Sequence, residues 1–154
     1  MIARFLFIPL LVESLLGCAS GRPQASTEDL VVAAVLRDVI AEETRWGTPV
    51  ICAPGRTDPS GTLLGLVRSG ATFEVSVCPD LTGDPTDSFR AVTRSTGARA
   101  YIVFWNEVAQ RESQKYEVQA GFNCGPTCGK LYQYRVGKSE GVWRVLGKVL
   151  LSVS

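Results

Sequence analysis

The chain has 154 residues, which is enough for one domain with a substantial core but not for two comfortable ones. Apolar residues make up 45% of it and the formal net charge is +1, which argues against disorder and against bulk attraction to nucleic acid. The chain has no histidine, which excludes Ser-His or Cys-His catalytic pairs, a histidine general base and His-ligated metal sites. A binding or structural module is not restricted in this way.

Residues 1–17 have the features of a targeting segment. A positively charged start precedes the apolar run 5–12, which is too short to cross a bilayer, since a spanning helix needs about 20 residues. The sequence LLGC at residues 15–18 then resembles the lipobox of bacterial lipoproteins. The resemblance implies cleavage before Cys18 and lipidation of that cysteine. The alternative is an ordinary signal peptide cut near Ala19 or Ser20, which would leave a fully soluble protein.

The lipobox resemblance also implies a domain organisation and a location. Residues 1–17 are expected to be the signal peptide, residues 18–27 the lipidated cysteine with a small, polar tether, and residues 28–154 a single domain. Ala19 stands where an aspartate would be expected for retention in the inner membrane, so the resemblance favours the outer membrane, facing the periplasm. We therefore expect an exported protein whose partner is a membrane, contacted through the N-terminal lipid.

A helix is predicted over residues 27–46. Ser26 or Thr27 can cap it, and acidic residues follow in the first turn, where the helix dipole favours anions. Its apolar residues recur with the helical period, and Gly47 and Pro49 mark its end.

The middle of the chain predicts short elements separated by loops. Residues 49–53 form a short apolar strand, residues 54–62 a turn-rich loop, and residues 72–78 an alternating strand. An acidic loop follows at 79–87, and then a short helix over 87–95. The aspartates of this loop, whose spacing does not match an EF-hand and which we expect to be solvated, are Asp80, Asp84 and Asp87.

Four further strands are predicted in series, over residues 100–105, 115–122, 131–136 and 141–153. Short polar connections between them indicate an antiparallel meander. The fold class is therefore α+β, with the N-terminal helix packed on a mainly antiparallel sheet that ends in this four-stranded meander. Strict alternation in the last strand would place one set of residues on one face: Trp143, Val145, Val149, Leu151 and Val153.

Four cysteines remain besides Cys18, and an even number in an exported domain suggests disulfides. Of the three possible pairings we favour Cys52–Cys78 and Cys124–Cys128. Loop closure would then stabilise the fold by about 3.5 and about 2 kcal/mol, respectively. A zinc site made of all four cysteines is the alternative, but it usually requires two close pairs, and Cys52 and Cys78 are far apart in sequence. No metal or cofactor is expected.

The sequence NCGPTCGK at residues 123–130 raises the question of redox chemistry. A thioredoxin-like centre has two residues between its cysteines and opens a helix, whereas three residues lie between Cys124 and Cys128. Strand-like sequence on both sides places the motif at the tip of a hairpin, where a disulfide would be structural. A thiol-disulfide function remains the alternative.

The C-terminal part of the chain, residues 116–154, resembles a pattern found in uncharacterised exported bacterial proteins. The pattern is a strand, a paired Cys-Gly turn, an aromatic strand and a Gly-x-Trp-x-Val strand that closes with a serine. It implies a small exported domain without an assigned activity. A helix on a curved sheet is also similar to cystatin-like and nuclear-transport-factor-like domains, at the level of the fold alone. The matching residues are Cys124, Gly125, Cys128, Gly129, Tyr132, Gly141, Trp143, Val145 and Ser154.

These observations favour a non-enzymatic binding or structural lipoprotein of the cell envelope, whose protein or small apolar ligand the sequence does not identify. Tyr132, Tyr134 and Trp143 could line a concave ligand site, although such aromatic residues more often belong to a core. The second hypothesis is a thiol-disulfide redox protein that uses the two cysteines of the NCGPTCGK turn. The third is a carboxylate hydrolase, with four candidate residues: Glu42, Glu43, Glu107 and Glu112.

Overall fold

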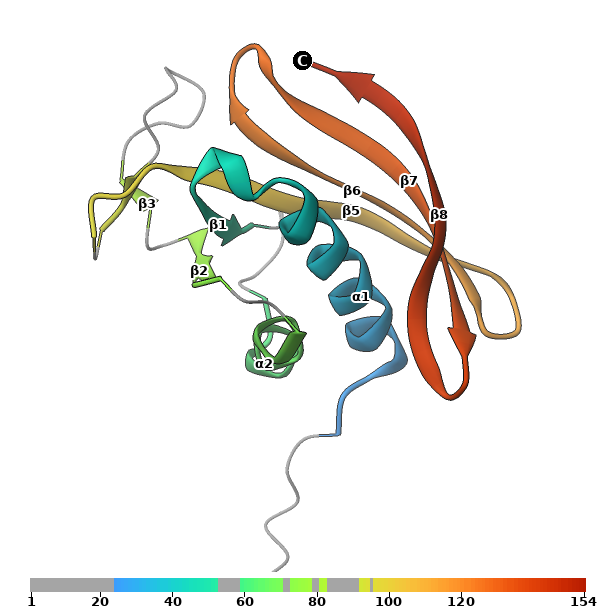
Figure 1. Cartoon of the computed structure of the whole chain (residues 1–154). Coiled ribbons are helices and arrows are strands. Elements are labelled where there is room, and N and C mark those ends of the chain that lie inside the picture. The colour runs from blue at the N-terminus through green and yellow to red at the C-terminus, as the bar shows by residue number, and fades with distance from the viewer. Residues whose placement is uncertain (1–23, 53–58, 71–72, 79–80, 83–91, 95) are drawn as a thin grey trace, which may run out of the picture.

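The structure, a computed structural model, describes residues 24–52, 59–70, 73–78, 81–82, 92–94 and 96–154 (Figure 1). These residues form an α+β domain, which confirms the predicted α+β class, and its six-stranded sheet is mixed. The helical elements are α1 (Thr27–Glu42), the 3-10 turn η1 (Thr44–Trp46) and α2 (Gly61–Gly70). The strands are β1 (Thr48–Ile51), β2 (Ser76–Val77), β3 (Leu81–Thr82), β4 (Val92–Thr93), β5 (Ala100–Glu112), β6 (Lys115–Gly125), β7 (Cys128–Ser139) and β8 (Val142–Val153).

The large sheet has the strand order β2-β1-β5-β6-β7-β8, and β3 pairs with β4 in a separate two-stranded sheet. β1 is parallel to both of its neighbours, so that Val50 lies between Ser76 of β2 and Ile102 of β5. The strands β5 to β8 pair in sequence order and antiparallel, as the four-strand prediction required. The sheet curves around α1, and β8 forms its outer edge (Figure 1).

The start and the end of α1 follow from local chemistry. The Ser26 side-chain oxygen accepts a hydrogen bond from the Asp29 backbone N–H at 3.0 Å, and the Asp29 carboxylate accepts one from the Ser26 N–H at 3.3 Å. This capping box selects Ser26 from the two expected caps. After η1 the chain turns at Gly47, which has φ +111°, and a Cβ there would lie 2.1 Å from the Arg99 carbonyl oxygen. Only glycine therefore fits at this turn.

One hydrophobic cluster joins α1 to the sheet. Leu36 and Ile40 of α1 are fully buried, as are Tyr101 of β5 and Tyr134 of β7. The Tyr101 ring meets the Phe122 ring of β6 edge to face at 6.1 Å between centroids. Eight residues of α1 are buried, and they are Val31, Val32, Ala33, Ala34, Val35, Leu36, Val39 and Ile40.

Several sequence predictions were wrong or incomplete. The helix α2 was not expected, although Leu63 and Val67, four residues apart, are its buried pair. The strand expected over residues 72–78 is reduced to β2. The short helix expected over 87–95 is contradicted at Val92–Thr93, which form the strand β4. Apart from Arg94, the other residues of that expected helix lie outside the described part of the chain. The three aspartates of the acidic loop lie outside it as well.

The predicted face of β8 was also wrong in part, because β8 contains two bulges. In the first bulge, Val145 pairs with Val136 of β7 and Gly147 pairs with Arg135, so Leu146 between them has no partner residue. In the second bulge, Leu151 is the extra residue between Leu150 and Ser152. Each extra residue reverses the alternation. Val149 therefore lies opposite Gln133, on the face away from the helix, whereas Trp143 and Val145 pack on the core.

We expect Leu36→Ala to lower the free energy of unfolding by about 2–5 kcal/mol, because it opens a cavity in the shared core. The matched control is Leu146→Ala on β8, where the side chain is 57% exposed and the change should stay within about 0.5 kcal/mol. Urea unfolding followed by circular dichroism measures both. Equal effects of the two substitutions would contradict the assignment of α1 to the core.

Candidate binding surface

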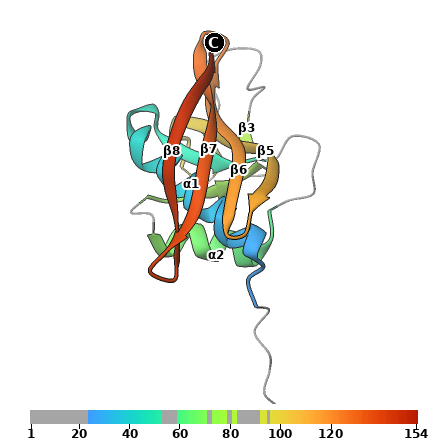
Figure 2. The same cartoon turned by 90° about the vertical axis from the view of Figure 1, so that its right-hand side faces the viewer.

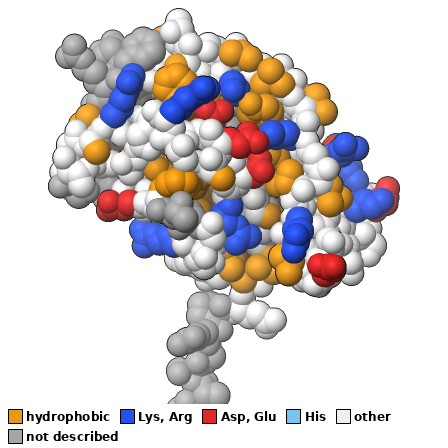
Figure 3. Space-filling view, in the orientation of Figure 1, with side chains coloured by type: hydrophobic (Ala, Val, Ile, Leu, Met, Phe, Trp, Pro, Cys, Tyr) orange, Lys and Arg blue, Asp and Glu red, His pale blue; other side chains and the backbone are white. Residues whose placement is uncertain are grey.

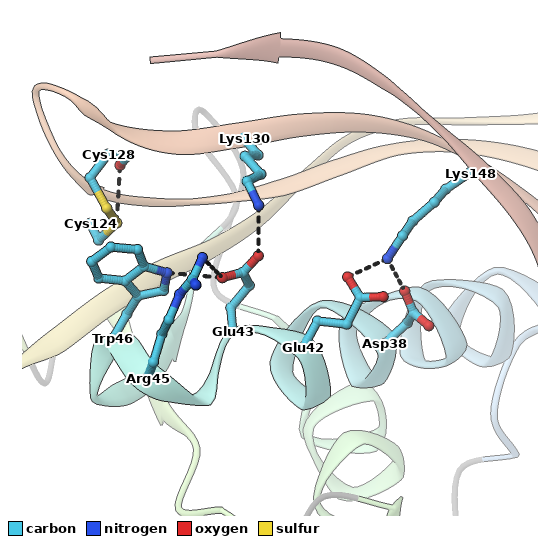
Figure 4. A network of polar contacts seen from close by, with 9 residues as sticks. All are labelled: Asp38, Glu42, Glu43, Arg45, Trp46, Cys124, Cys128, Lys130 and Lys148. Atoms are coloured by element: carbon cyan, nitrogen blue, oxygen red, sulfur yellow. Dashed lines mark hydrogen bonds and ion pairs between the residues drawn. A yellow bond between two sulfur atoms is a disulfide. The ribbon is translucent and has the colours of Figure 1, made fainter.

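Lysines of the sheet contact carboxylates on the C-terminal half of α1 (Figure 4). Lys148 of β8 pairs with Asp38 at 3.0 Å and with Glu42, and its ammonium group lies 5.1 Å from the centre of the Tyr132 ring. Carboxylates near a helix C-terminus oppose the helix dipole, and the last turn of α1 has no basic residue of its own. The sheet therefore supplies the positive charge that this end of the helix lacks.

Glu43, directly after α1, is the most buried charged residue described, with 4% of its surface exposed. Its carboxylate accepts a hydrogen bond from the Trp46 indole N–H at 2.9 Å and pairs with Lys130 of β7 at 3.3 Å. The Arg45 guanidinium lies 3.6 Å from the same carboxylate. A buried charge costs free energy unless it is paired and hydrogen-bonded, and here it is both.

These contacts shift the pKa values of the groups involved. Burial alone would lower the pKa of Lys130, but the hydrogen bond and the charge of Glu43 outweigh it, so the pKa is raised. The pKa of Lys148 is raised in the same way by Glu42 and Asp38. Burial, and then the charge of Glu43, raise the pKa of Tyr101. All three groups therefore keep their protons at neutral pH.

The paired-cysteine turn lies beside this cluster. Cys124 is the last residue but one of β6 and Cys128 begins β7, with a Cα–Cα distance of 5.2 Å, which lies within the disulfide range. Cys52 and Cys78 are 5.3 Å apart, so both preferred pairs lie at disulfide distance. A small hollow of about 150 Å³ beside the turn is lined by Trp46, Phe122, Thr127, Cys128, Gly129, Lys130, Val153 and Ser154.

The most unusual surface is β8, because every large hydrophobic residue that is exposed in the described part lies on this strand. Figure 3 shows hydrophobic side chains along the upper right of the molecule, where Figure 1 places β7 and β8. Scattered exposed apolar residues are ordinary, but several on one edge strand mark a candidate interaction site. The row, named here the β8 surface, consists of Val142, Leu146, Val149, Leu150, Leu151 and Val153.

The β8 surface is apolar on both faces of the sheet. Leu150 lies opposite Tyr132 and Val153 opposite Lys130, on the side of α1, whereas Val149 lies opposite Gln133 on the other side. Figure 2 looks onto that other side, and neither α1 nor α2 covers it. Among the described residues no strand pairs with the free edge of β8, so its backbone groups on that edge have no partner from another strand.

Covering the β8 surface would release appreciable free energy. Full burial of a valine or leucine side chain contributes about 1.5–3 kcal/mol, and these six are roughly half exposed, so each would contribute about 1 kcal/mol. Association itself costs about 4–15 kcal/mol. Burial of the row therefore offsets the lower part of this cost, and hydrogen bonds to the free edge of β8 would add to this gain.

The aromatic residues proposed for a concave ligand site belong to the core instead. Tyr134 is fully buried, and Tyr132 and Trp143 pack against the same cluster. Sequence reasoning missed the β8 surface because it assigned Val149 and Leu151 to a buried face. The bulges and the edge position, which the sequence does not display, expose these residues.

The four candidate carboxylates do not come together as a catalytic pair. Glu42 and Glu43 pair with different lysines, and Glu112 pairs with Lys115 at the β5–β6 turn, while Glu107 is exposed. Within the described ranges, no three metal-ligating side chains gather. Cys18 lies outside those ranges, and inside them no helix is long and apolar enough to cross a membrane.

No family model, curated protein sequence or solved structure matches the chain.

We expect Lys130→Met to lower the free energy of unfolding by about 2 kcal/mol, because Glu43 loses its closest cation while it remains buried. Adding Glu43→Gln should recover part of that loss. Lys115→Met is the control, because its pair with Glu112 is exposed and is worth less than about 0.5 kcal/mol. A double-mutant cycle in urea measures the coupling, and additive effects of the two substitutions would contradict it.

Proposed function

We propose that this protein is an envelope lipoprotein whose domain is a non-enzymatic binding or structural module, with the β8 surface as its contact site. The observation that carries the proposal is the row of six exposed apolar side chains on an edge strand. Small soluble domains rarely leave such a row uncovered, because it is a template for association.

The sequence supports the anchored part of the proposal. The LLGC sequence ends at Cys18, and α1 begins at Thr27, so a short tether of small and polar residues would separate the lipid from the domain. A lipid at this position would hold the domain close to a membrane, on our proposal the outer membrane on its periplasmic side. The likeness to cystatin-like or nuclear-transport-factor-like domains also remains a proposal, limited to a helix on a curved sheet.

A thiol-disulfide function of Cys124 and Cys128 is the second candidate, favoured by the partly exposed Cys128 next to a small hollow. Against it, both cysteines lie on strands and not at the start of a helix, so no helix dipole lowers a thiol pKa. Cys124 is also buried. We therefore prefer a structural role for the pair.

The reduction potential of the Cys124–Cys128 pair should lie below about −300 mV, as for structural disulfides. Equilibration with glutathione and dithiothreitol buffers, followed by peptide mapping, measures it. A potential near the −120 to −180 mV of thiol oxidants and isomerases would contradict the structural role and favour the redox function.

We expect Cys18→Ser to abolish the incorporation of labelled fatty acid and to release the protein into the soluble envelope fraction, because the acylated side chain is removed. Ser20→Ala, two residues further on, should leave both properties unchanged. The measurement is metabolic labelling and fractionation in the bacterium that makes the protein. A wild-type protein without label would contradict the anchor.

A photoreactive amino acid in place of Val149 should give protein adducts in intact cells, because Val149 is 60% exposed at the centre of the β8 surface. The matched control is Gln110, an exposed residue of β5, which β6 and β7 separate from β8 in the sheet. Adducts resolved by gel electrophoresis and mass spectrometry from position 149 but not 110 support the proposal. Equal yields from both positions, or none from 149, contradict it.

A further inference from the structure

The shape of the β8 surface restricts what can cover it. Alternate backbone N–H and C=O groups of an edge strand point outward and need hydrogen-bond partners when water is excluded. A lipid surface that buried β8 would leave these groups unsatisfied, which is costly. Since apolar side chains are also exposed on both faces, the occupant that satisfies the whole surface is another β-strand.

We infer that this strand is β8 of a second copy of the chain, paired antiparallel about a two-fold axis that passes beside Val149. The inference rests on the proposed function, in that it takes the β8 surface as the contact site. Antiparallel pairing of identical strands is self-complementary, because each contact occurs twice.

The faces of β8 are compatible with this axis. Two residues directly opposite one another in an antiparallel pair share a face of the sheet. An axis beside Val149 places this residue opposite itself, on the uncovered face, and places Lys148 opposite Leu150 of the second copy, both on the side of α1. It also brings Val145 opposite Val153, again on the side of α1. A shift by one residue would set Val149 opposite Leu150, which lies on the other face.

The charges of β8 are compatible with this pairing. Its 12 residues carry two charged side chains, Arg144 and Lys148, both positive. The axis beside Val149 places neither of them opposite a cation, since Arg144 then faces Ser154 of the second copy. Lys148 is already paired with Asp38 and Glu42, so its charge does not repel a neighbouring strand.

The area indicates a weak dimer. The paired segment, residues 145–153, would be about 30 Å long on a sheet about 10 Å thick, which gives a flat contact of about 300 Å² per copy. Stable interfaces bury about 800 Å² per partner. The bulges at Leu146 and Leu151 further limit regular pairing to the residues between them. We therefore expect a dimer that depends on concentration in solution and that is favoured when lipid anchors hold two copies in one membrane.

Sedimentation velocity tests the inference on residues 18–154 with Cys18→Ser, from micromolar to millimolar concentration. No described hydrogen bond or ion pair involves a residue before Ser26, so this chain keeps the described contacts. We expect the average mass to rise from monomer to dimer with concentration. Val149→Lys, at a side chain already 60% exposed, should raise the dissociation constant at least tenfold. Gln110→Lys, at an exposed position of β5 outside the β8 surface, should leave it unchanged.

The register is tested by Val149→Cys with oxidised glutathione, because the axis brings the two added thiols together. A disulfide-linked dimer is expected at position 149 and none for Gln110→Cys, which lies outside the β8 surface, while circular dichroism verifies the fold of each variant. A monomer at every concentration, or a dimer insensitive to Val149→Lys, would overturn the pairing. Where the dimer is absent, photo-crosslinking at position 149 in cells separates two cases. Adducts to another protein would mean that the binding function stands and only the self-pairing fails. The absence of such adducts would mean that both fail.

Discussion

The burial of α1 against the curved sheet is the contact on which the rest of the structure depends. A single helix of 16 residues is marginal in water, and strands β5 to β8 have no other described layer to cover their concave side. Each therefore completes the core of the other. The carboxylates at the end of α1 add a constraint, since they oppose the helix dipole and are matched by Lys130 and Lys148 of the sheet. Hydrophobic burial holds the layers together, and these pairs stabilise the C-terminal end of the helix.

The elements that the sequence predicts are those whose signal is long and regular. α1 shows a helical period with a cap, β5 begins with a continuous apolar run over residues 100–105, and β6 and β7 alternate. α2 escaped prediction because it has only 10 residues, begins and ends with glycine, and buries two side chains. The β8 surface was not predicted from the sequence for a different reason. An extra residue in a strand moves the side chains of all the residues after it to the opposite face of the sheet. Neither Leu146 nor Leu151 has a sequence feature that predicts a bulge.

The edge strand combines features that usually oppose one another. Bulges and a lysine that points inward are devices by which proteins prevent pairing at a sheet edge. β8 has both, yet it also exposes the apolar row. The lysine is the informative residue, because Asp38 and Glu42 neutralise it. A charge whose partners lie within its own molecule no longer repels a neighbouring strand, so β8 is protected against indiscriminate pairing but not closed to a matching strand.

The order of the cysteines has a consequence for biogenesis. The four cysteines of the domain lie at disulfide distance in consecutive pairs, Cys52 with Cys78 and Cys124 with Cys128. On our proposal that the protein is exported, its thiols would reach the oxidising side of the membrane in that same order. Sequential oxidation would then favour these two pairs over the alternative pairings.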